Sequence, residues 1–308
     1  MRTRRIIRFC LLLYILGSLI LGISLGELAF RPNRRLITQE QTIGISADFG
    51  VSLQNVSITA SDHVTLRGWY ARPVSSNGNA VILLHGHGDN RQGMTGYAEL
   101  FLSRGFSVLL PDSRAHGESG GRFPTFGINE SEDVHRWFDW LTKQDHPKCI
   151  FGMGESMGAA ILLQAIRKES RFCAVIAESP FASFREVGYL RVGQFVHAGP
   201  WLGEVPLRPA VELAFLYGRV TRHVDLTKAS PEFAVAESRV PVLLIHGLAD
   251  TNIPVQESET IHAANSAYTT LWEIPGAGHC GGISTVPKEF TARVVGWFES
   301  HEYASAAK

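Results

Sequence analysis

Short apolar runs alternate with segments of helical periodicity along most of the chain. We expect strands at the apolar runs near residues 80–85, 106–110, 149–154, 172–178, 240–246 and 270–274. Helical patterns lie between most of these runs, near residues 92–104, 129–144, 157–168, 256–265 and 287–299. A hairpin is predicted earlier, between Val51 and Arg72, because apolar and polar residues alternate on both sides of the turn at Ser61-Asp62-His63. Strands that alternate with helices favour the α/β class, with a mainly parallel sheet and helices on both faces.

The N-terminal segment differs from the rest of the chain. The run from Phe9 to Leu25 contains no charged residue, and its length is close to that of the shortest membrane spans. No pair of small residues marks a signal-peptidase site at its end. We therefore expect residues 1–30 to form an uncleaved signal anchor, with a cleaved signal peptide and secretion as the alternative.

Arginines flank this run on both sides, at positions 2, 4, 5 and 8 before it and at positions 31, 34 and 35 after it. The four that precede the run favour a cytoplasmic N-terminus, and therefore a catalytic domain on the non-cytoplasmic side of the membrane. The three that follow it weaken this orientation. Residues 31–50 are expected to form a linker.

Composition narrows the functional classes. The chain has 308 residues, of which 45% are hydrophobic, and this is enough for one large core. Lys and Arg number 29, as do Asp and Glu, so no excess of basic charge points to a nucleic-acid partner. His85 and His87 could suggest a metal, but no cysteine or carboxylate cluster completes a ligand set. Neither a metal nor a cofactor is expected.

The strongest chemical signal is Gly154-Glu155-Ser156-Met157-Gly158, which has the form G-x-S-x-G. It follows an expected strand and precedes a helix-forming segment, and in that context the pattern forms a nucleophile elbow. Glycines two residues to either side of the serine remove side chains that would collide with the neighbouring strand and helix. The pattern alone also fits an ordinary glycine-rich turn, so the assignment depends on partners elsewhere in the chain.

Candidate partners follow in the order that such a site requires. A serine hydroxyl needs a base, and the base needs an acid that orients it. Asp250 comes directly after one apolar strand pattern, and His279 comes after the next, in a glycine-rich loop. Both therefore lie past the carboxyl ends of successive strands, where open parallel sheets build their sites. Asp225 and Glu237 also lie between the serine and the histidine, but neither directly follows a strand.

A further element follows the first core strand, at His85-Gly86-His87-Gly88-Asp89. The small residue at position 86 lets the backbone approach a substrate carbonyl. We expect the backbone amides of His87 and Met157 to form an oxyanion hole.

Five motifs together resemble those of the α/β-hydrolase superfamily. They are H-G-x-G at His85, D-x-R-x-x-G-x-S at Asp112, G-x-S-x-G at Gly154, H-G-x-x-D at His246 and a late G-H at His279. The resemblance covers residues 50 to 300 and is nearest to serine aminopeptidase-like, monoacylglycerol lipase-like and protein depalmitoylase-like hydrolases. It implies the α/β-hydrolase fold and catalysis by Ser156, Asp250 and His279, and it does not select a substrate.

The stretch from residue 181 to residue 238 is longer than a crossover needs, and it contains two helical patterns, near 183–197 and 207–220. In the superfamily that this chain resembles, such insertions form a cap. We therefore expect a small helical cap within a hydrolase domain of residues 51–300, followed by a tail of residues 301–308. The apolar side chains of the insertion would suit an acyl group, although ordinary helix packing also explains most of them.

The cysteines bear on the compartment. Cys149 and Cys173 lie near the starts of two strands that we expect to be neighbours. A disulfide would suit an exported domain, but adjacent parallel strands offer poor geometry for one, so the unpaired state is favoured. Cys280 follows the candidate histidine, and we expect a packed thiol there, because Ser156 already occupies the elbow.

These inferences predict a membrane-anchored serine hydrolase that cleaves a carboxylic ester or thioester, either acyl-lipid-like or small. An amide or peptide hydrolase and an acyltransferase would use the same three side chains, so both remain alternatives. A non-catalytic binding protein is a remote alternative, because such proteins on this fold usually lack a member of the triad. The expected partners are a small acyl substrate and, through the N-terminal helix, the membrane.

Overall fold

The structure is a computed structural model that describes residues 2–32, 34–38, 51, 53–195, 199 and 201–302. The chain divides into two compact units. The smaller unit comprises Met1–Arg31 and Ser183–Ala229, and the larger comprises Pro32–Ala182 and Ser230–Lys308. Most of the expected linker at residues 31–50 and of the expected tail at residues 301–308 lies outside the described residues.

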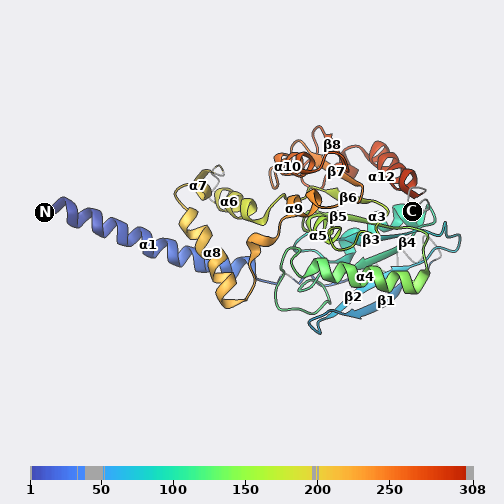
Figure 1. Cartoon of the computed structure of the whole chain (residues 1–308), viewed down its shortest axis with the longest axis horizontal. Coiled ribbons are helices and arrows are strands. Elements are labelled where there is room, and N and C mark those ends of the chain that lie inside the picture. The colour runs from blue at the N-terminus through green and yellow to red at the C-terminus, as the bar shows by residue number, and fades with distance from the viewer. Residues whose placement is uncertain are drawn as a thin grey trace. The chain divides into compact units, whose positions relative to one another are not determined.

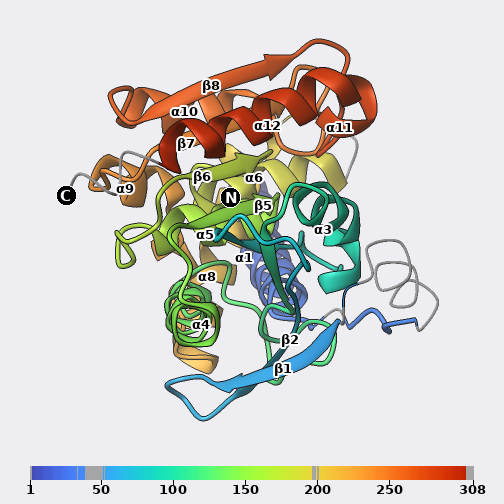
Figure 2. The ribbon, with the colours of Figure 1, turned by 90° about the vertical axis from the view of Figure 1, so that its right-hand side faces the viewer.

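The larger unit is built on an eight-stranded sheet with the order β1-β2-β4-β3-β5-β6-β7-β8 (Figure 1, Figure 2). The hairpin partners β1 and β2 are antiparallel, as are β2 and β4, and every other neighbouring pair is parallel. The strands are β1 Gln54–Thr59, β2 Thr65–Ala71, β3 Ala80–Leu84, β4 Ser107–Pro111, β5 Ile150–Glu155, β6 Val175–Glu178, β7 Val242–Gly247 and β8 Thr269–Ile274. The predicted hairpin and the six predicted core strands are confirmed.

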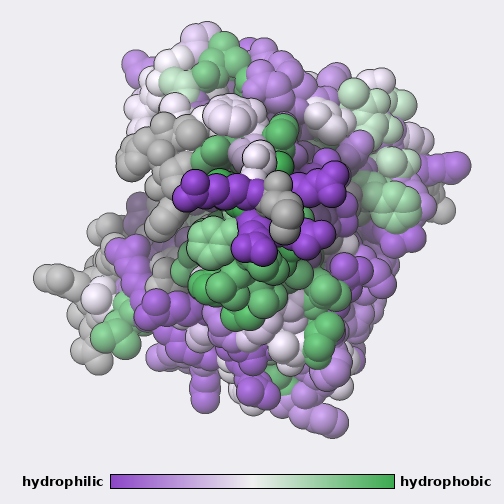
Figure 3. All heavy atoms as spheres, turned by 90° about the vertical axis from the view of Figure 1, so that its left-hand side faces the viewer, coloured by the Kyte–Doolittle hydropathy of each residue, from purple (hydrophilic) through white to green (hydrophobic). Residues whose placement is uncertain are grey.

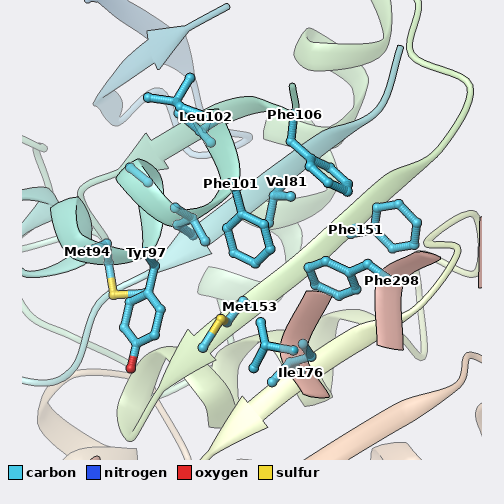
Figure 4. Close-up of a cluster of buried hydrophobic side chains, with 14 of the residues drawn as sticks. Val81, Met94, Tyr97, Phe101, Leu102, Phe106, Phe151, Met153, Ile176 and Phe298 are labelled. Carbon is cyan, nitrogen blue, oxygen red and sulfur yellow. The ribbon is translucent and has the colours of Figure 1, made fainter. Parts of the chain in front are cut away.

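One face of the sheet is covered by α3 (Thr95–Leu102) and α12 (Pro287–Glu302). Figure 4 shows the aromatic centre of this layer, in which Phe298 of α12 stacks on Phe151 of β5, with 4.5 Å between ring centroids, and on Phe101 of α3, with 5.3 Å. Alternate residues of the central strands point into the same cluster. Burial of this many aromatic and aliphatic side chains fixes both helices on the sheet.

The opposite face is covered by α4 (Glu130–Asp145), α5 (Met157–Ala165) and α10 (Gln256–Ala264). Leu162 of α5 packs over Gly152 of β5, where an added Cβ would lie 2.7 Å from a Leu162 methyl carbon. On the same side, α9 (Pro231–Ala236) contacts α5 and α10. The short helices η1 (Arg91–Met94) and α11 (Gly282–Thr285) complete the larger unit. Helices on both faces of a mainly parallel sheet give the α/β-hydrolase fold that the sequence predicted.

Cys149 and Cys173 form a disulfide, so the expectation of two unpaired thiols is wrong. Their Cα atoms are 5.8 Å apart, which lies within the usual range for such a bond. Both residues precede the first paired residues of their strands, and the Cys173 amide donates to the Ile150 carbonyl at 3.0 Å. The two residues are therefore diagonal neighbours just before the first paired residues of β5 and β6. There the regular spacing of paired parallel strands no longer fixes the distance between their side chains.

The smaller unit contains the insertion helices α6 (Phe184–Phe195), α7 (Trp201–Glu204) and α8 (Arg208–Thr221), followed by η2 (Leu226–Lys228). The two helices predicted in the insertion are confirmed as α6 and α8. Tyr189 of α6 donates to the Glu212 carboxylate of α8 at 2.5 Å, which ties these two helices together.

The N-terminal helix α1 (Arg2–Ala29) packs against α8 through small residues. An added Cβ at Gly22 would lie 2.7 Å from the Ala210 carbonyl oxygen, and one at Gly26 would lie 2.6 Å from a ring carbon of Tyr217. Only glycine therefore lets the two helices approach this closely. A polar cluster closes the end of the contact, where Glu27 accepts hydrogen bonds from Tyr217 and Arg222.

The remaining faces of α1 are apolar and exposed, with Ile6, Phe9 and Leu12 between 58 and 64% exposed. Figure 3 views the molecule from the left-hand side of Figure 1 and shows a group of hydrophobic atoms near the centre of this face, with hydrophilic atoms around it. By length and composition α1 could cross a membrane, and a signal sequence at the N-terminus has the same properties.

Candidate active site

Ser156 occupies the turn between β5 and α5. Its backbone has φ of 50°, which a residue with a side chain seldom adopts, and its amide donates to the Glu178 carbonyl at 2.8 Å. The flanking glycines are sterically required. A Cβ added to Gly154 would lie 2.5 Å from the carbonyl carbon of Gly158, and a Cβ added to Gly158 would lie 2.2 Å from the carbonyl oxygen of Leu84. The sharp strand-to-helix turn expected of the motif is therefore present.

Asp250 lies in the turn that follows β7. Its Oδ1 accepts hydrogen bonds from the backbone amides of Asn252 at 2.8 Å and Ile253 at 2.9 Å. These two bonds orient the carboxylate independently of any other side chain. Burial by itself would raise the pKa of Asp250, but hydrogen bonds from His246, His279 and the Ile253 amide outweigh it and hold the pKa well below its usual range. The group is a carboxylate at neutral pH.

His279 joins the other two predicted residues. Its Nδ1 lies 2.7 Å from Asp250 Oδ2, and its Nε2 lies 2.9 Å from Ser156 Oγ. The sequence separations of these pairs are 29 and 123 residues, so the sheet alone brings them together. The imidazole side chain is 23% exposed, whereas the Asp250 side chain is fully buried.

The loop that carries His279 is held by the end of β6. The Cys280 amide donates to Ser179 Oγ at 3.2 Å, and the Gly282 amide donates to Glu178 Oε1 at 2.9 Å. Burial raises the pKa of the Cys280 thiol, so this group is protonated and is not a competing nucleophile.

The two residues predicted for the oxyanion hole, His87 and Met157, both lie in segments next to Ser156. Met157 is the first residue of α5, and His87 follows Gly86, whose added Cβ would lie 3.6 Å from Ser156 Cβ. The loop after β3 therefore runs beside Ser156. The hydrogen-bonding role of these two amides remains a prediction.

The histidines of this loop are structural. Burial lowers the pKa of His85 to about 4, and the neutral ring accepts from the Ser113 amide through Nε2 at 3.0 Å. The ring of His87 packs against His116 and Phe126 at centroid distances of 5.4 and 5.5 Å. Burial also lowers the pKa of His116 to about 4.

The D-x-R-x-x-G-x-S motif is also structural. Asp112 accepts from the backbone amides of Arg91 and Glu118, both at 2.8 Å, and forms an ion pair with the Arg91 guanidinium. An added Cβ at Gly117 would lie 2.3 Å from the same carboxylate. Ser119 Oγ donates to the Asp112 carbonyl at 2.7 Å. The motif therefore braces the loops on the carboxyl side of the sheet.

One group among the described residues could present three ligand atoms to a metal ion, namely His135, Asp139 and Glu169. Arg171 already forms ion pairs with both carboxylates, at 2.7 Å to Asp139 and 2.5 Å to Glu169. His135 Nδ1 lies 2.7 Å from Glu169 as well. The donors are thus used within the protein, and we assign no metal to them.

Sequence reasoning missed several residues around the elbow. His246 Nε2 lies 3.4 Å from Asp250 Oδ2, and its Nδ1 pairs with Ser258 Oγ at 2.7 Å. Glu155 and Glu178 lie behind the serine and share the hydroxyl of Tyr97. The available signal was a polar residue at the end of an apolar strand, which His246 and Glu178 both display.

Residues 81–293 match the model of the alpha/beta hydrolase family, and the chain belongs to that family. The chain is 30% identical over 229 residues to an uncharacterized protein of Mycobacterium tuberculosis, covering 73% of this chain and 72% of that one. It is 28% identical over 217 residues to the uncharacterized protein YqkD of Bacillus subtilis, covering 70% and 68% of the two chains.

Solved structures give the same class. The esterase Pf2001 of Pyrococcus furiosus superposes with a TM-score of 0.70 at 26% identity, covering 88% of this chain and 98% of that one. An acylaminoacyl peptidase of Pyrococcus horikoshii superposes with a TM-score of 0.60 at 17% identity, covering 81% of this chain and 41% of that one, which is a likeness of fold alone. The fold and these relatives place the chain among α/β hydrolases that include esterases and peptidases.

Proposed function

We propose that this protein is a serine hydrolase that cleaves a carboxylic ester or thioester through a covalent acyl-enzyme. The observation that carries the proposal is the unbroken hydrogen-bond chain from Ser156 Oγ through His279 to Asp250. Its distances of 2.9 and 2.7 Å suit transfer of the serine proton to the imidazole.

In this mechanism Ser156 Oγ attacks the carbonyl carbon while His279 Nε2 takes the hydroxyl proton. The imidazolium then returns this proton to the leaving oxygen or sulfur, and the acyl group stays on the serine. In the second half His279 Nε2 takes a proton from a water molecule whose oxygen attacks the acyl carbon. The imidazolium then gives this proton to Ser156 Oγ as the bond between the acyl carbon and Oγ breaks, and the acid is released. Asp250 keeps the Nδ1–H tautomer in place and stabilises the imidazolium, and its low pKa keeps it charged throughout.

The amides of His87 and Met157 are proposed to hold the oxyanion. Each donor of this kind is worth about 3 kcal/mol to the transition state. Because the backbone amide is the donor at both positions, the side chains of His87 and Met157 are not needed for this role and can pack against their neighbours.

An ester preference is supported by the likeness to the Pyrococcus furiosus esterase, which extends over nearly the whole of that chain. A peptidase preference has weaker support. The uncharacterized peptidase YuxL of Bacillus subtilis is 23% identical over 271 residues, which cover 39% of that chain. Amide hydrolysis and acyl transfer are therefore kept as outcomes of the test.

The test is active-site labelling with a fluorophosphonate, followed by an acyl-ester panel of increasing chain length. Ser156→Ala is expected to abolish labelling and to lower ester turnover by several orders of magnitude. Ser284→Ala, which removes an exposed hydroxyl on α11, is the matched control and should label normally. Peptide hydrolysis without ester hydrolysis would overturn the ester assignment, and ester product formed only with an added alcohol would indicate an acyltransferase. Labelling that persists in Ser156→Ala refutes the nucleophile.

We further propose that α1 is a signal anchor that places the catalytic unit on the non-cytoplasmic side. The disulfide between Cys149 and Cys173 supports export, because such bonds persist in oxidising compartments. The alternative is a cleaved signal peptide and secretion. Alkaline carbonate extraction distinguishes the two. An anchored chain stays with the membrane and keeps an intact N-terminus by mass spectrometry, whereas a processed chain is released and shortened.

A further inference from the structure

Two carboxyl groups lie directly behind the proposed nucleophile. Glu155 ends β5 and precedes Ser156, Glu178 ends β6, and the two residues are register partners in the parallel ladder. Their side chains therefore leave the sheet on the same face. On that face Tyr97 of α3 inserts its hydroxyl between them, 2.7 Å from Glu155 Oε1 and 3.0 Å from Glu178 Oε2. Figure 4 shows Tyr97 pointing this hydroxyl away from the aromatic core.

The number of protons in this cluster is limited. A phenol carries one hydrogen, so Tyr97 can donate to one carboxylate only. A hydrogen bond to the second carboxyl group requires that group to be an acid that donates to the phenol oxygen. Two carboxylates at these distances would leave one anionic oxygen facing a lone pair. The geometry is satisfied when the pair of glutamates holds one proton.

The neighbouring donors assign that proton to Glu155. Glu178 is buried and accepts from the Gly282 amide at 2.9 Å, which favours its ionised form. Glu155 has Tyr97 as its hydrogen-bond partner among the described residues. Burial, followed by the charge of Glu178, raises the pKa of Glu155 to about 7, and burial raises the pKa of Glu178 as well.

The surrounding charges act in the same direction. Asp89, in the loop after β3, and Glu178 both raise the pKa of Glu155. His279 and His246 favour the charged form of Glu178. Burial raises the pKa of Tyr97 well above its usual value, and that of the Cys280 thiol also rises, so neither becomes charged in the neutral range.

Glu178 also connects the cluster to the reacting groups. Its carbonyl accepts the Ser156 amide at 2.8 Å, and its carboxylate accepts the Gly282 amide in the loop that carries His279. A second negative charge across Tyr97 would repel Glu178 and disturb both contacts at once. The distance from Ser156 Oγ to His279 Nε2 depends on these two anchors.

We propose that Glu155, Tyr97 and Glu178 form a positioning cluster that shares one proton and keeps the serine and the histidine loop in register. The proposal rests on the hydrolase function proposed above. When Glu155 loses its proton to solvent, the pair becomes doubly charged and the alignment of Ser156 with His279 is lost. Activity then falls on the alkaline side through a group outside the Ser156–His279–Asp250 chain.

The experiment is the pH dependence of fluorophosphonate labelling and ester turnover in the full-length protein. The wild type should lose activity as pH rises above about 7. Glu155→Gln keeps a donor for the phenol oxygen and cannot ionise, so its profile, scaled to its own maximum, should lack the alkaline fall and keep the acidic one. Glu273→Gln, on the exposed face of β8, is the matched control and should keep both limbs. An alkaline fall with an unchanged midpoint in Glu155→Gln overturns the proposal.

Tyr97→Phe gives a second test that does not depend on the amide substitution. Phenylalanine cannot accept from Glu155 and donate to Glu178, so the alkaline limb of Tyr97→Phe should leave its wild-type midpoint. A limb that stays in place contradicts the shared proton.

Thermal melting separates this inference from the hydrolase proposal. Glu155 has a raised pKa in the folded state, so its contribution to stability is complete below the unfolded value of 4.5 and is lost as pH rises through about 7. The wild type should therefore lose stability relative to Glu155→Gln over that interval, with a change in the unfolding equilibrium constant on the order of tenfold, because partial exposure of Glu155 screens the charge. A constant difference between the two melting temperatures refutes the cluster, even if no substrate is turned over.

Discussion

Removal of the disulfide offers a quantitative test of how the elbow is braced. The bond joins positions 24 residues apart and encloses β5, the turn at Ser156 and α5. Closing a loop of this length in the unfolded chain costs an entropy equivalent to about 3 kcal/mol. The double variant Cys149→Ala and Cys173→Ala should lose about this much stability. Alanine is chosen because Cys149 is buried and a serine hydroxyl there would add an unrelated cost.

The assay is thermal melting followed by tryptophan fluorescence, with and without a reductant. For a domain of this size a loss of about 3 kcal/mol lowers Tm by roughly 6–12 °C. Reductant should lower the Tm of the wild type by a similar amount and leave the double variant unchanged. Cys280→Ala removes a free thiol and is the control. The reasoning fails if reductant has no effect on the wild type, or if mass spectrometry finds free thiols at both positions in protein from an oxidising compartment.

Three further outcomes are expected. Asp250→Asn should lower turnover by about 10⁴-fold, because the imidazole loses its orienting anion. Asp225→Asn, which changes the competing acid at the N-cap of η2, should leave turnover nearly unchanged. Gly158→Ala should destabilise the protein by at least about 1–3 kcal/mol in chemical denaturation, since its Cβ would lie 2.2 Å from a carbonyl oxygen, whereas Gly296→Ala, with nothing within 4 Å, should not destabilise it. Turnover should also fall at acidic pH, because a protonated His279 cannot accept the serine proton, and a rate that is flat on the acidic side contradicts its role.

The sequence was sufficient for the order of elements and for the candidate site, for a physical reason. Strands β3 to β7 are buried on both faces, so each is built largely of apolar residues, whereas β8 exposes one face. The residues that follow these strands fall on one edge of the sheet. Asp250 and His279 could therefore be placed beside Ser156 before any distance was known. Their catalytic roles remain predictions, and their separations in the structure are those that such roles require.

Features that depend on the stagger between strands could not be predicted. The spacing of ideal parallel strands disfavours a bond between Cys149 and Cys173, whereas their diagonal placement before the first paired residues of β5 and β6 allows it. The pairing of Glu155 with Glu178 has the same origin, because a shift of one residue would turn one carboxyl group to the other face. Tyr97 is an aromatic residue on an apolar helix, and nothing in its neighbours indicates a polar target.

The contact of α1 with α8 has a practical consequence for anyone who shortens the chain. Helix α8 presents Ala210, Leu213 and Tyr217 to the glycines of α1, and this surface is complementary to a helix without side chains at those points. A chain that begins at Arg31 would expose this surface of α8 and leave the Arg222 guanidinium without its carboxylate partner. We expect such a truncated protein to self-associate through this surface. A synthetic peptide of residues 9–30, added in detergent, should cover the surface and return the truncated protein to the monomer.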